Sequence, residues 1–149
     1  MDYTTMASVK AGFLLLSTII LSACTSDAPI EPKQIKVEQL QHNWKLTHID
    51  NIQLAAIINS TLNITADNKS TGSLGCNHFS GTAELSNNQL QIAKIMSTRK
   101  LCSKLENDVE MDVSQVLSDW TNIMIDDETL ILSNQKHSLT YQQIDQVAQ

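Results

Sequence analysis

Apolar and polar residues alternate over most of the chain that follows residue 42. A period of two is typical of half-buried β-strands, whose successive side chains point to opposite faces of a sheet. The pattern predicts seven or eight short strands, at residues 44–49, 61–65, 70–74, 82–85, 89–93, 122–125, 129–132 and 138–142. The apolar stretch 54–58 is a further candidate for pairing with the first strand.

Turn residues separate these strands. Ser86-Asn87-Asn88 predicts a tight hairpin, because Asn tolerates a positive φ angle. Asp126-Asp127-Glu128 predicts another hairpin turn, since it lacks the interleaved spacing of a calcium-binding loop. The segment from Gly75 to Gly81 (GCNHFSG) interrupts the alternation, and its two glycines predict a bulge or a tight corner.

A single strong helix signal follows. Ser103-Lys104-Leu105-Glu106 matches a capping box, with Ser103 as the N-cap and Glu106 three residues later. Apolar residues then recur at spacings of three and four, at Leu105, Val109, Val113, Val116, Leu117 and Trp120. This stripe predicts packing on the protein's own sheet, and docking of a partner helix is the less favoured alternative.

These elements predict a mainly β (α+β) fold. We expect a small antiparallel β-barrel or rolled sheet of seven to eight strands, with one α-helix at about residues 104–120 packed over one end.

Residues 1–23 predict a lipoprotein signal peptide. Residues 11–21 are eleven consecutive apolar and small residues, which suits a signal-peptide core and is too short for a membrane-spanning helix. Leu21-Ser22-Ala23-Cys24 resembles the lipobox of bacterial lipoprotein precursors, which implies that Cys24 becomes the lipidated N-terminus. The alternatives are an ordinary secretory signal with a chance cysteine, or an N-terminal membrane helix.

Residues 24–37 predict a flexible tether, because the segment is polar and contains Pro29 and Pro32. Thr25 follows the cysteine, where an Asp would be the familiar signal for retention in the inner membrane. The expected location is therefore the outer membrane, with the domain lipid-anchored on its periplasmic face.

Charge and composition narrow the classes of partner. The net charge of −6 argues against nucleic-acid binding, which needs a basic stripe to displace counterions from phosphate. Arg99 is the only arginine in the sequence. The aromatic content of 4% is too low for a stacking platform or for a carbohydrate groove lined with rings. We expect a monomer without a cofactor.

Cys76 and Cys102 remain once Cys24 is assigned to the lipid. An even pair in an exported chain predicts a disulfide, and two buried free thiols are the alternative. A metal site is disfavoured, because the pair lacks CxxC spacing and the four histidines are scattered.

Two segments carry a resemblance to the META domain family. They are GCNHFSG at residues 75–81 and MSTRKLC at residues 96–102, and the resemblance covers residues 38–145. His78 and Lys100 depart from the family's usual Arg and apolar residue. The motif residues brought over by the resemblance are Gly75, Asn77, Phe79, Gly81, Thr98 and Arg99, for which a structural role is favoured over ligand binding.

The resemblance implies an envelope-anchored, stress-associated lipoprotein. It links the chain to the heat-stress response and novobiocin tolerance, and it implies no catalytic activity. With the lipid anchor and the missing catalytic motifs, it favours a protein that acts by interaction, for example in outer-membrane integrity. Pairing of His78 with Ser80, or of Cys102 with a histidine, is weighed against this, but no nucleophile elbow, metal-ligand spacing or phosphate loop is present. The expected partners are the membrane, through the anchor, and an envelope protein. The alternative is a small-molecule-binding barrel that sequesters an amphiphile or a drug.

Overall fold

The computed structural model describes residues 34–144. The predicted signal peptide, the lipidation site Cys24 and the tether up to residue 33 lie outside the described residues and stay predictions. The elements in chain order are η1 (Val37–Leu40), β1 (Asn43–Ile49), β2 (Ile52–Gln53), β3 (Asn59–Ile64), β4 (Lys69–Gly75), β5 (His78–Ser86), β6 (Gln89–Ser97), α1 (Lys104–Ser118), β7 (Thr121–Asp126), β8 (Thr129–Ser133) and β9 (Ser138–Ile144).

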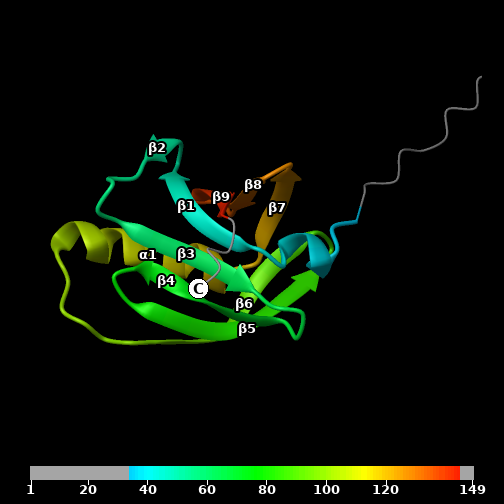
Figure 1. The fold of residues 1–149 in the computed structure, drawn as a ribbon, viewed down its shortest axis with the longest axis horizontal. Helices are drawn as coiled ribbons and strands as arrows, with labels where there is room; N and C mark the ends of the chain where they lie inside the picture. Colours follow the sequence, from blue (N-terminus) through cyan, green and yellow to red (C-terminus); the bar gives the residue numbers. More distant parts are fainter. Residues whose placement is uncertain (1–33, 145–149) are drawn as a thin grey trace, which may run out of the picture. The chain divides into compact units, whose positions relative to one another are not determined.

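Eight antiparallel strands close into a barrel, in the order β1-β3-β4-β5-β6-β7-β8-β9 (Figure 1). Closure comes from β1, which pairs with β9 along its whole length and with β3 through residues 43–45. The remaining part of the same β1 edge pairs with the two-residue strand β2. The predicted fold class is confirmed. Of the stretch 54–58, only Leu54 bonds back to the first strand, its N–H donating to the Thr47 carbonyl at 2.9 Å, and residues 55–58 form no strand.

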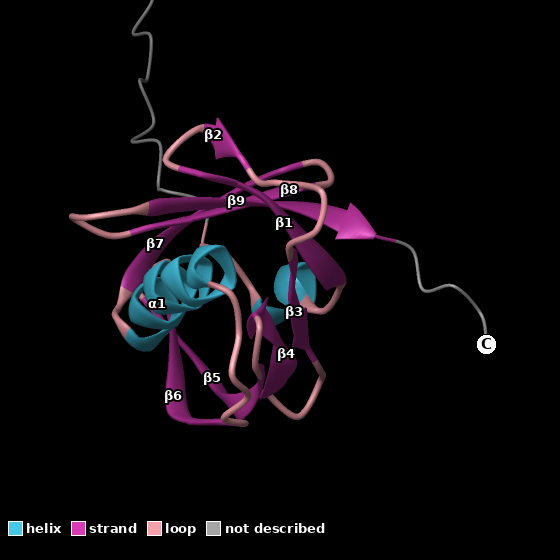
Figure 2. Ribbon diagram, turned by 90° about the vertical axis from the view of Figure 1, so that its left-hand side faces the viewer, coloured by secondary structure: helices cyan, strands magenta, loops and turns pink. Residues whose placement is uncertain are grey.

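The seam between β6 and β7 is the weakest joint of the barrel. It consists of two paired positions, Gln89 with Asn122 and Leu90 with Thr121. Figure 2 shows α1 lying in the opening between these strands. The helix packs against β4 and β6 and buries Val109, Val113, Val116 and Leu117 there.

The helix differs from its prediction at both ends of the apolar stripe. It ends at Ser118, because Asp119 is extended (ψ 161°) and leads directly into β7. Leu105 and Trp120 are exposed rather than packed in the core, so their assignment to the buried stripe is wrong. The predicted capping box is confirmed, with Glu106 N–H donating to Ser103 Oγ and Ser103 N–H donating to the Glu106 carboxylate.

Large side chains fill the interior of the barrel. Those that are almost completely buried include Leu46, Leu62, Ile92, Leu132, Trp44 and Tyr141. At the end of the barrel where the described chain begins, η1 contributes the buried Leu40, whose carbonyl accepts a hydrogen bond from Trp44 Nε1 at 3.0 Å. Burial raises the pKa of the Tyr141 phenol well above its usual value, so the core contains no ionised tyrosine at physiological pH.

The two predicted hairpin turns have the positive φ angles that such turns require. Asn87 and Asn88 have φ angles of 49° and 59° between β5 and β6, as the predicted hairpin requires. Asp127 has a φ of 46° in the turn between β7 and β8.

Candidate functional site

The two motif segments meet at one corner of the barrel. Gly75 ends β4 with a φ of 124°, a left-handed conformation that L side chains rarely adopt. A Cβ on Gly75 would lie 3.0 Å from Val109 Cγ1, so the corner also needs glycine to admit α1 at close range. Cys76 and Asn77 then turn the chain into β5.

Asn77 is the centre of this corner and is 5% exposed. Its backbone N–H and its side-chain Nδ2 both donate to the Glu110 carboxylate, at 2.9–3.1 Å. Its Oδ1 accepts from the Thr98 hydroxyl at 2.8 Å and from the Lys100 backbone N–H at 2.7 Å. One side chain therefore joins the β4–β5 corner, the loop after β6 and helix α1.

Cys76 and Cys102 form a disulfide at the same place, with their Cα atoms 6.2 Å apart. The bond connects residues that are 26 positions apart in the sequence. It fastens the chain just before α1 to the corner that Asn77 also holds. A bonded thiol is not available as a nucleophile or a metal ligand.

The other motif residues have separate roles. Phe79 is buried, and Gly81 lies where a Cβ would meet the Ile92 side chain and the Ala93 carbonyl. Thr98 N–H donates to the His78 carbonyl at 3.0 Å and so extends the β5–β6 pairing. Arg99 is exposed and makes no hydrogen bond or ion pair within residues 34–144.

The chain from Lys94 to Lys104, which we call the basic segment, runs along this corner. It contains Lys94, Arg99, Lys100 and Lys104 and no acidic residue, whereas the whole sequence has 16 acidic and 10 basic residues. Lys104 pairs with Asp108 at 2.6 Å. Leu101 is fully exposed (105%), and Met96 is exposed as well.

A second polar cluster links the β1–β2 turn, the chain before β9 and α1. His137 Nδ1 lies 2.8 Å from Asp50 Oδ2, and His137 Nε2 lies 3.7 Å from Asp112 Oδ1. Hydrogen bonds from His137 and then from the Ser138 backbone N–H lower the pKa of Asp50. The cluster ties two turns to the helix, and no hydroxyl or thiol nucleophile hydrogen-bonds to His137 in the described chain.

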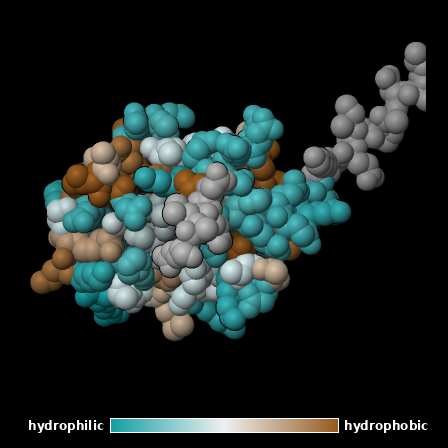
Figure 3. Space-filling model, in the orientation of Figure 1, coloured by the Kyte–Doolittle hydropathy of each residue, from teal (hydrophilic) through white to brown (hydrophobic). Residues whose placement is uncertain are grey.

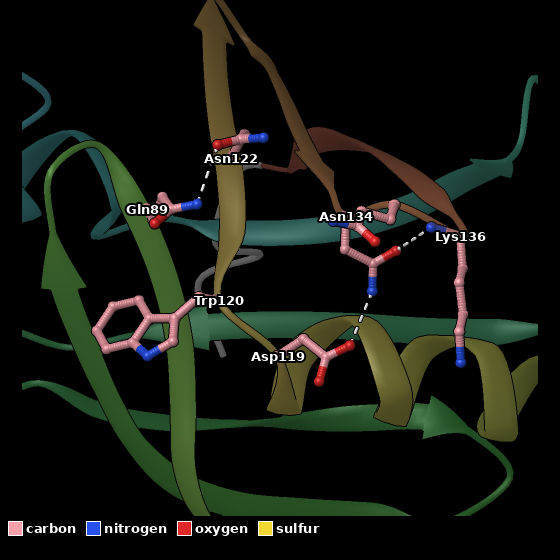
Figure 4. Close-up of a pocket in the computed structure, with 7 residues that line it drawn as sticks. Gln89, Asp119, Trp120, Asn122, Asn134 and Lys136 are labelled. Carbon is pink, nitrogen blue, oxygen red and sulfur yellow. Dashed lines mark hydrogen bonds between the residues drawn. The ribbon is translucent and has the colours of Figure 1, made fainter.

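An open pocket of about 430 Å³, which we call the amide pocket, lies where the β6–β7 seam meets the β8–β9 turn (Figure 4). Its lining residues are Gln89, Asn122, Asn134, Gln135, Asp119, Trp120 and Lys136. The sequence does not predict this site, because its residues come from three distant stretches of the chain and share no local motif.

The described residues offer neither a metal site nor a membrane-spanning helix. Residues 34–144 contain no group of three or more His, Cys, Asp or Glu side chains placed to hold a metal ion. None of the helices in that range is long and apolar enough to cross a bilayer.

The fold and the motif corner agree with one family of proteins. The META domain profile matches residues 37–146. This chain belongs to the META domain family. A relative of the domain, heat shock protein HslJ of Escherichia coli strain K12, is 28% identical over 138 residues, which cover 91% of this chain and 95% of HslJ.

Solved structures share the META domain fold. One NMR structure is 25% identical with a TM-score of 0.67, and its whole length corresponds to 77% of this chain, so that protein folds as the domain alone. An NMR structure from Burkholderia xenovorans has a TM-score of 0.60 at 17% identity and covers 82% of this chain and 97% of its own. A crystal structure of a DUF4847 family protein from Bacteroides vulgatus ATCC 8482 has a TM-score of 0.53 at 14% identity, covering 74% and 99%. The last two show the fold alone.

Proposed function

We propose that this META domain protein is an envelope-anchored, stress-associated lipoprotein that acts by binding another protein and not by catalysis. The similarity to a protein named for heat shock supports a role in the heat-stress response. The lipobox at Leu21-Ser22-Ala23-Cys24 supports a lipid anchor, and Thr25 supports the outer membrane, with a monomeric domain on the periplasmic face. Outer-membrane integrity and novobiocin tolerance are the processes in which we expect it to act.

The observation that carries the proposal is the exposed apolar tip of the basic segment. Leu101 is fully exposed although the disulfide of Cys102 and the Lys100 N–H bond to Asn77 fix the chain on both sides of it. A large apolar side chain held rigidly in water is typical of a binding surface, because its burial then costs little conformational entropy. Arg99 and Lys100 directly precede it, so we infer a partner with acidic residues beside an apolar pocket.

The position of the basic segment suits this role. Figure 1 places η1, where the described chain begins, at the right-hand end of the barrel and the loop that precedes α1 at the left-hand end. Figure 3 shows hydrophobic surface at the same left-hand end. The loop that carries Leu101 therefore lies at the end of the domain opposite η1, where apolar surface is available to a partner.

The alternative function, a barrel that sequesters an amphiphile or a drug, needs an internal cavity. The interior is instead occupied by Trp44, Tyr141 and the surrounding aliphatic side chains. An amphiphile would have to displace several of them, and close-packed cores resist such insertion. The structure thus favours an interaction surface over an internal carrier.

Photocrosslinking in intact cells tests the proposal. A photoreactive residue at position 101 should yield an adduct of discrete mass, whereas the same residue at Met124, which is exposed on β7, should not. Arg99→Glu with Lys100→Glu should abolish the adduct, and Lys45→Glu, an exposed lysine on β1, should leave it unchanged. Equal adducts from positions 101 and 124, or adducts insensitive to the charge reversal, would refute the binding surface.

A further inference from the structure

Four of the seven residues that line the amide pocket carry amides, which both donate and accept hydrogen bonds. Gln89, Asn122, Asn134 and Gln135 each supply an amide, and Asp119 and Lys136 add one negative and one positive charge. A phosphate site would need an excess of cations, and a lipid site would need apolar walls. The lining of this pocket has neither feature, so it suits a neutral ligand with many hydroxyl groups.

Hydrogen bonds between the lining residues fix the orientation of the amides. Gln89 Nε2 donates to Asn122 Oδ1 at 3.1 Å, and Asn134 Nδ2 donates to Asp119 Oδ2 at 3.1 Å (Figure 4). Asn134 Oδ1 accepts the backbone N–H groups of Lys136 and His137, both at 2.9 Å. Side chains held in this way lose little rotamer freedom when a ligand binds.

Each of these pairs leaves a hydrogen-bonding group available to a ligand. In the described part of the chain, no protein group bonds to Gln89 Oε1, Asn122 Nδ2 or Asp119 Oδ1. Two acceptors and one donor therefore remain around one depression. A sugar hydroxyl can donate one hydrogen bond and accept others. It therefore matches this set of donors and acceptors better than a ligand that only donates or only accepts.

Trp120 supplies the apolar component of the site. It lies at the start of β7, 42% exposed, and Figure 4 shows its ring below Gln89 at the edge of the pocket. A large exposed indole can cover the C–H face of a pyranose while the amides bind its hydroxyls. The low aromatic content argues against a groove lined with several rings, but this site needs only one ring.

We propose that the amide pocket binds a neutral saccharide, such as a hexose or N-acetylhexosamine unit of an envelope glycan. Its volume of about 430 Å³ lies within the common range for ligand sites of roughly 300–1,000 Å³. The site is independent of the lipid anchor and of the basic segment, so it stands if either of those proposals fails.

The two tryptophans give a direct test. Trp44 is 1% exposed and Trp120 is 42% exposed, so quenching of fluorescence by acrylamide reports on Trp120. A soluble chain of residues 32–149 is suitable, since it is one compact unit and a relative of about this length folds by itself. N,N′-diacetylchitobiose or maltose should protect Trp120 saturably, with a dissociation constant on the order of 1 mM, as expected for an open polar site.

Substitutions of lining residues test whether the saccharide binds in the amide pocket. Asn122→Ala and Asp119→Asn should each weaken the protection about tenfold, which corresponds to the loss of one hydrogen bond of about 1.4 kcal/mol. Met124→Ala, an exposed apolar change on the same strand, should leave the affinity unchanged. Absence of protection by both disaccharides, protection that persists in both pocket variants, or stronger protection by inorganic phosphate would each overturn the proposal.

The source of the glycan is distinguished by a sedimentation experiment. The same chain is incubated separately with insoluble peptidoglycan and with lipopolysaccharide vesicles, and Asn122→Ala is the control in each arm. Depletion from the supernatant by peptidoglycan assigns the site to the cell wall, and depletion by the vesicles assigns it to surface glycan. Depletion by neither, with the disaccharides also inactive, overturns the proposal.

Discussion

Asn77 holds more of the motif corner together than any other single side chain. Its four side-chain hydrogen bonds reach Glu110, Thr98 and Lys100, and the residue itself is buried. Asn77→Ala should therefore lower the free energy of unfolding by about 2–4 kcal/mol, because the Lys100 N–H and the Thr98 hydroxyl lose their acceptor and the Glu110 carboxylate keeps only the backbone N–H donor. Chemical denaturation measures this, and Asn59→Ala, an exposed Asn on β3, should change stability by less than about 0.5 kcal/mol.

An isosteric change separates packing from hydrogen bonding at the same position. Asn77→Asp keeps the volume but replaces the Nδ2 donor by a second carboxylate facing Glu110. Its deficit in stability should be largest near pH 7 and shrink in acid, where protonation of one carboxylate removes the repulsion. A deficit that does not change with pH would show that Glu110 is not the partner that matters.

The sequence predicts single residues well where the reason is local. The left-handed Gly75, the positive φ angles of Asn87 and Asn88 and the Ser103 cap all follow from side-chain chemistry within a few positions. The partners of Asn77 do not, because they lie 21–33 residues away in sequence.

Among the secondary-structure elements, the sequence predicted where α1 begins but not where it ends. The spacing of three and four continues to Trp120, but the helix must stop at Ser118 so that β7 can pair with β6 through Thr121 and Asn122. Tertiary pairing therefore decides the boundary where local pattern favours continuation. The same change exposes Trp120, which is why the amide pocket could not be predicted from periodicity.

The disulfide joins the β4–β5 corner to the chain entering α1. Closing a loop of 26 residues removes chain entropy from the unfolded state, worth about 3.5 kcal/mol. Reduction should lower the melting temperature by about 15 °C, given the entropy of unfolding of a domain of this length. The native fold should survive reduction, because the Asn77 bonds to Thr98 and Lys100 hold the same two segments.

Melting curves with and without reductant measure that difference by circular dichroism. The control is the double variant Cys76→Ala and Cys102→Ala. Its melting temperature should be close to that of the reduced wild type and should not change when reductant is added. If the wild type melts at one temperature under both conditions, the bond does not contribute to stability in solution.

Closure of the complete barrel depends on pairing between strands that are far apart in the sequence. The β1–β9 pairing that closes it joins Asn43 to Ile144, and no local signal in the sequence marks such a pair. The fold class was nevertheless predictable, since eight amphipathic strands of similar length have few ways to bury one face each. The basic segment is visible in the sequence as a run of cations, but only the fold shows that Leu101 protrudes from it.

Anchoring determines where these surfaces act, and Cys24 provides the test. One acyl chain gives only marginal membrane binding, since each buried CH₂ contributes about 0.8 kcal/mol, whereas two or three chains hold a protein stably. Mass spectrometry of the mature protein should therefore find an N-terminal diacylated or triacylated Cys24. Cys24→Ser should leave a precursor that still carries residues 1–23, while Ser26→Ala, just outside the lipobox, should mature normally. A bare thiol at position 24 of the wild-type chain would refute the lipid anchor, and with it the proposed place of the domain at the outer membrane.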